Sequence, residues 1–173
     1  FRITAIMLNW SKVFNAMGTI MSIEKVVKGI KIIDLHELDS DFSGIKDEKL
    51  ITLAEKTLDL KFPDDYRFFL QVLGCGDIGG REFYGVIDSD FINSSIPDAI
   101  WITLQERLES GLPNNYIVIS DTGDGSYVVL NCIECDEDKI MLWTPGINDP
   151  NTSFDRYYSD FGTFFYDQIV NLI

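Results

Sequence analysis

The stretch LKFPDDYRFFLQVLGCGDIGGREFYG, residues 60–85, decides the fold of this chain. Pro63 can open a helix, because its fixed φ suits the first turn and its missing N–H is not needed there. Apolar side chains then recur at helical spacing, at Tyr66, Phe69, Leu70 and Leu73. Gly74 is a natural helix end, and residues 81–87 are typical of a strand. The order is therefore helix, glycine turn, strand.

The same stretch contains GCGDIG, residues 74–79, which fits the G-x-G-x-x-G pattern of dinucleotide sites. Such a site requires a strand before the glycines and a helix after them, so that the phosphates meet the helix N-terminus. Here the order is inverted. We therefore interpret the glycines as a helix end and a turn that needs positive φ, and we expect no nucleotide site.

Outward from this stretch, the pattern predicts helices and strands in blocks. Helices are expected at 47–58, 63–73, 96–108 and 160–172, and strands at 81–87, 116–120, 126–131 and 139–143. Helices followed by meandering strands and a last helix are typical of an α+β fold, and a length of 173 residues suits a single domain.

Two of the later helices have a face that we expect to point into the core. The helix at 96–108 would bury Ile100, Leu104 and Leu108. Asp160 is expected to cap the last helix, whose inner face carries Phe161, Phe164, Phe165, Ile169 and Leu172.

The net charge of −14 limits the partners that the chain can bind. An acidic surface repels phosphate backbones, so direct nucleic-acid binding is disfavoured. The same surface attracts basic proteins and speeds their association at low salt. Solubility alone is the alternative reason for such acidity.

Three cysteines, Cys75, Cys132 and Cys135, are odd in number and unevenly spaced, which does not fit a disulfide framework and favours a reducing cytoplasm. Cys132 and Cys135 form one C-x-x-C, half of a zinc site, which would need Cys75 and His36 to complete it. Acidic residues follow the pair and would raise the thiol pKa. We expect structural cysteines, no metal and no cofactor. No stretch approaches the roughly 20 apolar residues of a membrane helix.

Residues 121–125, DTGDG, can be interpreted in three ways. They lack the ligand positions of a calcium loop, so a hairpin turn or an exposed acidic recognition loop fits better. A metal-dependent hydrolase built from Asp64, Asp65, Asp121 and Asp124 stays an alternative. Because a single histidine lies far in sequence from the cysteines, we expect no catalytic residue and no enzyme.

Residues 1–20 contain no acidic side chain, and Met21 begins a run typical of a bacterial start. We expect residues 1–20 to be a non-native or disordered extension and residues 21–173 to form one domain. Intact-mass measurement of the protein from its natural locus tests this expectation.

Four segments together resemble the SUKH superfamily, which includes a yeast cell-wall synthesis regulator and bacterial toxin-immunity proteins. They are residues 53–70 with their F-P-x-x-Y-x-x-F-L run, 74–85 with the glycine turn and strand, 112–127 with the central hairpin, and 139–169 with the last strand and helix. Leu73-Gly74-Cys75 stands where many members have Asn-Gly-Gly, and Phe62 replaces the usual leucine. The resemblance implies a mixed, mainly antiparallel sheet flanked by helices and used for binding partners.

For function, the resemblance implies a cytoplasmic immunity protein, or antitoxin, that occludes a cognate protein toxin, such as a basic nuclease domain. A non-enzymatic regulatory scaffold that binds several proteins is the alternative. No membrane partner is expected, and the oligomeric state is left open. The acidic residues that we expect to contact the partner are Asp64, Asp65, Asp77, Asp121, Asp124, Glu134 and Asp136.

Overall fold

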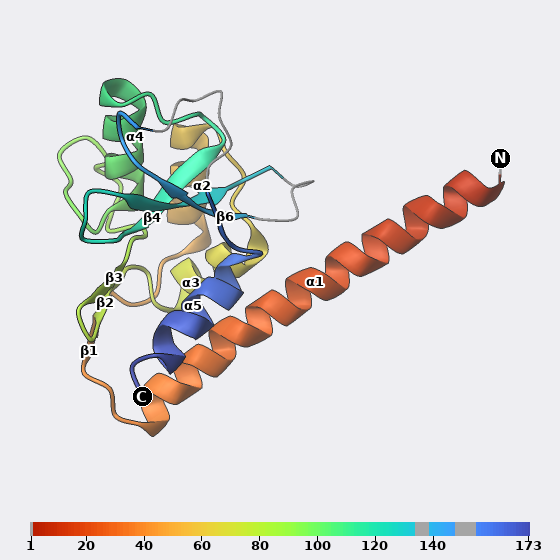
Figure 1. Cartoon of the computed structure of the whole chain (residues 1–173), viewed down its shortest axis with the longest axis horizontal. Helices are drawn as coiled ribbons and strands as arrows, with labels where there is room; N and C mark the ends of the chain where they lie inside the picture. Colours follow the sequence, from red (N-terminus) through yellow and green to blue (C-terminus); the bar gives the residue numbers. More distant parts are fainter. Residues whose placement is uncertain (1, 134–138, 148–154) are drawn as a thin grey trace.

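The computed structural model of the chain describes residues 2–133, 139–147 and 155–173. The helices are α1 (Arg2–Leu35), α2 (Glu48–Leu58), α3 (Asp64–Val72), α4 (Ala99–Glu109) and α5 (Phe161–Val170). The strands are β1 (Ser40–Phe42), β2 (Gly76–Ile78), β3 (Arg81–Phe83), β4 (Tyr116–Asp121), β5 (Tyr127–Asn131), β6 (Ile140–Trp143) and β7 (Asp155–Tyr158). Figure 1 shows the arrangement.

The strands form two antiparallel sheets, so the α+β fold predicted from the sequence is confirmed. One sheet has the order β1-β2-β3 and the other the order β4-β5-β6-β7. The strand expected at 81–87 ends at Phe83, and the strands β1, β2 and β7 are not predicted from the sequence. Each of these strands has only three or four residues, which is too short for a period-two pattern to stand out.

The glycine turn between α3 and β3 contains strand β2. A Cβ atom at Gly76 would lie 2.0 Å from the carbonyl oxygen of Asp41, so only glycine lets β2 approach β1 this closely. Gly74, with φ of 77°, follows the end of α3. The order helix, turn, strand is confirmed, and it excludes the geometry of a dinucleotide site at these glycines.

Aromatic side chains from several elements fill the core where α3, α5 and β3 meet. Phe69 of α3 lies 5.1 Å from Phe161, 5.6 Å from Phe165 and 6.2 Å from Phe83, measured between ring centroids. All four are buried. Most residues predicted to lie on the inner faces of α3 and α5 are therefore buried. Asp160 caps α5 as expected, because its carboxylate accepts from the Thr163 N–H at 2.7 Å.

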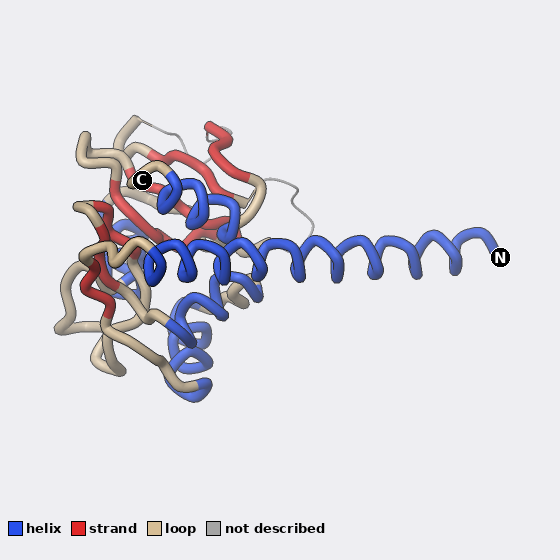
Figure 2. The backbone as a smooth tube through the Cα atoms, turned by 90° about the horizontal axis from the view of Figure 1, so that it is seen from below, coloured by secondary structure: helices blue, strands red, loops and turns tan. Residues whose placement is uncertain are grey.

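Helix α1 packs against α5 along its C-terminal half, while its N-terminal half extends away from the rest of the molecule (Figures 1 and 2). The two helices approach closely because each has a glycine at the contact. Gly29 of α1 lies beneath the ring of Phe165, and Gly162 of α5 lies against the backbone of Ser22. That residues 1–20 are non-native stays a prediction. None of the helices in the described ranges combines the length and hydropathy that crossing a bilayer requires.

Helix α4 is turned differently from the prediction. Ile100 is buried, but Leu108 is 82% exposed. The face that meets the neighbouring elements instead runs through Thr103, whose hydroxyl accepts from the Val118 N–H at 2.9 Å, and Arg107, which donates to the Leu58 carbonyl oxygen at 2.9 Å. This face of α4 therefore meets its neighbours through hydrogen bonds between polar side chains and backbone groups, and not through the apolar side chain of Leu108 as predicted.

Candidate partner-binding surface

Three acidic side chains lie in one row across the β1-β2-β3 sheet. Asp77 of β2 is paired with Asp41 of β1 on one side and with Glu82 of β3 on the other. Residues directly opposite each other in antiparallel strands share a face of the sheet. We call Asp41, Asp77 and Glu82 the acidic row.

The acidic row works against the stability of the sheet that carries it. Like charges placed directly opposite each other destabilise a strand pair, and no ion pair neutralises any of the three among the residues that the structure describes. Asp41 is exposed, and Asp77 and Glu82 are partly exposed. Repulsion retained at an accessible position is typical of a binding surface, where a partner supplies the opposite charge.

Tyr84 connects the acidic row to the end of β4. Its hydroxyl lies 3.4 Å from Asp121 Oδ2, and its backbone N–H donates to the Ile119 carbonyl oxygen at 2.8 Å. Burial raises the pKa of Tyr84 strongly, and the charges of Asp121 and Glu82 raise it further. Asp121 therefore lies close enough to Glu82 for both to act on one hydroxyl, and the negative potential continues from one sheet to the other.

The loop at 121–125 is an ordered turn whose carboxylates bind their own backbone. Asp121 Oδ1 accepts from the Gly123 N–H at 2.8 Å, and Asp124 Oδ1 accepts from the Thr122 hydroxyl at 2.6 Å and the Ser126 N–H at 3.1 Å. The bonds from Thr122 and Ser126 lower the pKa of Asp124, so it stays charged. This arrangement fits a hairpin turn that displays fixed negative charge.

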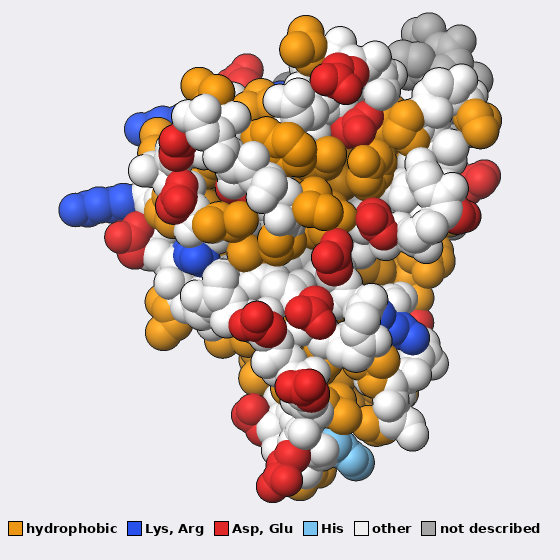
Figure 3. Space-filling model, turned by 90° about the vertical axis from the view of Figure 1, so that its left-hand side faces the viewer, with side chains coloured by type: hydrophobic (Ala, Val, Ile, Leu, Met, Phe, Trp, Pro, Cys, Tyr) orange, Lys and Arg blue, Asp and Glu red, His pale blue; other side chains and the backbone are white. Residues whose placement is uncertain are grey.

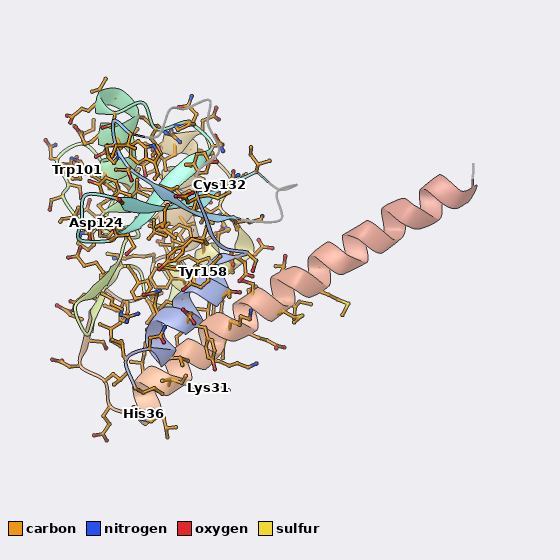
Figure 4. All side chains as sticks on the ribbon, viewed as in Figure 1. Lys31, His36, Trp101, Asp124, Cys132 and Tyr158 are labelled. Atoms are coloured by element: carbon orange, nitrogen blue, oxygen red, sulfur yellow. The ribbon has the colours of Figure 1, made fainter. Side chains whose placement is uncertain are left out.

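The acidic row and this loop lie on the same side of the molecule. Figure 3 views the side where β1, β2 and β3 lie in Figure 1, and Figure 4 places Asp124 on that side. Asp and Glu side chains spread over this face around an apolar area, with few Lys or Arg side chains among them. The face therefore offers both negative charge and apolar contact area.

One residue predicted for this surface is not part of it. Asp65 is only 4% exposed, and its carboxylate accepts from the N–H groups of Tyr66 at 2.8 Å and Gly162 at 3.1 Å. Asp64 is exposed at the start of α3, where its negative charge interacts favourably with the helix dipole. Their adjacent positions at a helix start predict that both are surface residues. In fact, the turn of the helix points one outward and the other toward α5.

Of the other predicted residues, Asp77 is the centre of the acidic row and Asp121 belongs to the 121–125 turn, while Asp124 lies on the side of the molecule that carries β1, β2 and β3 (Figure 4). Glu134 and Asp136 fall outside the described residues. Sequence reasoning missed Asp41 and Glu82. The signal was weak, because each stands at the centre of a three-residue strand, and only the pairing register reveals that they flank Asp77.

The cysteines offer no reactive site in the described part of the chain. Burial raises the pKa of Cys75, and it raises the pKa of Cys132 to about 12. His36 lies beyond the end of α1, far from Cys132 (Figure 4). No three His, Cys, Asp or Glu side chains in the described ranges gather closely enough to hold a metal ion.

A family model described as SUKH_5, SMI1-KNR4 cell-wall, matches residues 23–170. The chain belongs to the SUKH superfamily. No curated protein matches it. Membership places this SUKH protein in a group of immunity and regulatory proteins, and the match begins within α1 and ends at the last residue of α5.

Proposed function

We propose that this SUKH protein is an immunity protein that neutralises a basic protein toxin by covering its active surface. The observation that carries the proposal is the acidic row, in which three like charges are held side by side and none forms an ion pair with a described residue. Family membership supports it, because immunity proteins belong to the same superfamily.

Charge complementarity explains how such binding would work. A nuclease domain must attract phosphate and is therefore basic along its substrate groove. An acidic protein steers toward that groove, associates quickly at low salt and then blocks it. Occlusion alone stops the toxin, so the immunity protein needs no chemistry of its own.

Co-expression with the toxin encoded next to its gene tests the proposal. We expect the wild-type chain to restore growth of cells that produce the toxin, and the two proteins to purify as one complex. A variant with Asp41→Asn, Asp77→Asn and Glu82→Gln should fold and yet protect poorly. Toxicity that persists in the presence of folded wild-type protein, with no complex formed, would overturn the proposal.

A regulatory scaffold is the second candidate, favoured by the cell-wall description of the matched family model. In that case, the acidic face would bind several cellular proteins instead of one toxin. Gene context separates the two candidates: a large toxin gene immediately upstream supports immunity, whereas a gene that stands alone supports the scaffold.

A further inference from the structure

The junction of α1, α3 and α5 contains two carboxylates that bind the same hydroxyl. Ser22 Oγ of α1 lies 2.5 Å from Asp65 Oδ2 of α3 and 2.7 Å from Asp160 Oδ1 at the N-cap of α5. Ser22 and Asp65 are buried. The Gly162 N–H points at the same place, 3.1 Å from Asp65 Oδ2 and 3.2 Å from Ser22 Oγ.

The hydrogens available do not satisfy these contacts when both carboxylates are ionised. A hydrogen must lie between two oxygens at this separation, and a serine hydroxyl has only one to donate. If the hydroxyl hydrogen of Ser22 points to Asp160, no hydrogen lies between Ser22 Oγ and Asp65 Oδ2. If it points to Asp65, no hydrogen lies between Ser22 Oγ and Asp160 Oδ1. One further proton would place a hydrogen in both contacts.

The neighbours of the two carboxylates decide which one carries that proton. Asp160 accepts from the Thr163 N–H at 2.7 Å, the Thr163 hydroxyl at 2.7 Å and the Ser159 hydroxyl at 2.6 Å, which together favour its charged form. Burial opposes this, yet the hydrogen bonds leave the pKa of Asp160 lowered. Burial raises the pKa of Asp65, and the charge of Asp160 adds to the rise.

The other charged or titratable groups near the pair do not replace the proton. Lys25 of α1 donates to Thr163 Oγ1 at 2.7 Å and so reaches Asp160 only through that hydroxyl. Cys132, just beyond β5, interacts electrostatically with Asp65, but its pKa of about 12 keeps the thiol neutral. Among the residues that the structure describes, Asp65 thus forms no ion pair with a cation.

We propose that the junction holds one extra proton, donated from Asp65 to Ser22 while Ser22 donates to Asp160, so that α1 is held to the body most firmly at mildly acidic pH. The proton comes from solvent as the three helices meet. Folding is then coupled to proton uptake at a site distinct from the acidic face.

The direction of the pH effect follows from the two carboxyls. Because its pKa is raised in the folded state, Asp65 contributes to the free energy of unfolding at low pH. This contribution is complete below the unfolded pKa of about 3.9 and is lost as pH rises through the folded pKa. Because its pKa is lowered in the folded state, Asp160 contributes to the free energy of unfolding above the unfolded pKa of about 3.9. This contribution is lost as pH falls through its folded pKa. Stability from the junction therefore peaks between the two folded values.

Carboxyl ¹³C NMR titration of the full chain tests the proposal directly. We expect Asp65 Cγ to titrate above about 3.9 and Asp160 Cγ below it. Asp160→Asn keeps an oxygen for Ser22 and Thr163 but removes the charge, so it should shift the Asp65 midpoint downward. An Asp65 midpoint at or below the ordinary value, or one that Asp160→Asn leaves unchanged, would overturn the proposal.

Urea unfolding as a function of pH gives an independent readout. Asp65→Asn supplies a permanent donor to Ser22, so its urea midpoint should lose the rise that the wild type shows from neutral to mildly acidic pH. Asp64→Asn, at the exposed neighbouring position, should keep that rise. If Asp65→Asn follows the wild-type curve, the junction holds no extra proton.

Discussion

Buried charge at single residues decides how the helices meet. Glu55 is 2% exposed, and it accepts from the Phe62 N–H at 2.9 Å and binds Arg67 at 2.6 Å and Lys61 at 2.8 Å. Arg67 also pairs with Glu48 at the start of α2. Glu55 therefore joins α2 to the segment that opens α3, and its charge is satisfied from three directions.

Replacing Glu55 with Gln should destabilise the protein by about 2 kcal/mol, because Arg67 loses a charged hydrogen-bond partner. Burial opposes ionisation of Glu55, but bonds from Lys61, Phe62 and Arg67 lower its pKa, so its contribution is present above pH of about 4.3 and is lost on acidification through the folded pKa. Urea unfolding at neutral and acidic pH measures both effects. Lys49→Gln serves as the control: this lysine is exposed on α2, and the change should alter stability by less than about 0.5 kcal/mol.

Gly162 is the residue whose size limits the approach of α1 to α5. A Cβ atom there would lie 2.0 Å from the Ser22 carbonyl oxygen, a backbone atom that cannot turn aside. Gly162→Ala should therefore destabilise the protein by about 2 kcal/mol, measured by thermal or urea unfolding. Gly18→Ala, with no atom within 4 Å of the added Cβ, should not destabilise it. Equal stabilities for the two variants would show that the close contact does not exist.

At the scale of elements, α4 shows how a helix is oriented by polar anchors. Ile100→Ala should destabilise by about 3 kcal/mol, because the side chain is fully buried. Leu108→Gln should change stability by less than about 0.5 kcal/mol, since Leu108 faces solvent. Unfolding of both variants in urea measures the contrast. A large loss for Leu108→Gln would mean that α4 is rotated from the position described.

Elements with a strong local pattern could be predicted from the sequence. α2 and α3 have clear apolar faces and start signals at Asp47 and Pro63, and their bounds agree with prediction to within one or two residues. The acidic row could not be predicted, because its strands have three residues each and the row exists only once their register is known. Likewise, the burial of Asp65 depends on α1 and α5, which lie far from it in sequence.

At the scale of the whole molecule, acidic side chains have different roles in two regions. The junction of α1, α3 and α5 encloses its carboxylates and uses them for structure, whereas the face formed by β1, β2, β3 and the 121–125 loop exposes its acids. The net charge of −14 alone would not separate these roles. Binding of a basic partner should therefore depend on which acids are removed more than on how many.

The affinity for the neighbouring-gene toxin domain, measured by isothermal titration calorimetry, tests this central claim most directly. Two variants with the same change of charge are compared: Asp41→Asn, Asp77→Asn, Glu82→Gln in the acidic row, and Glu24→Gln, Asp59→Asn, Glu109→Gln at exposed positions on other elements. We predict binding weaker by about tenfold or more for the first variant and within about twofold of wild type for the second. Equal affinities for the two variants would contradict the account.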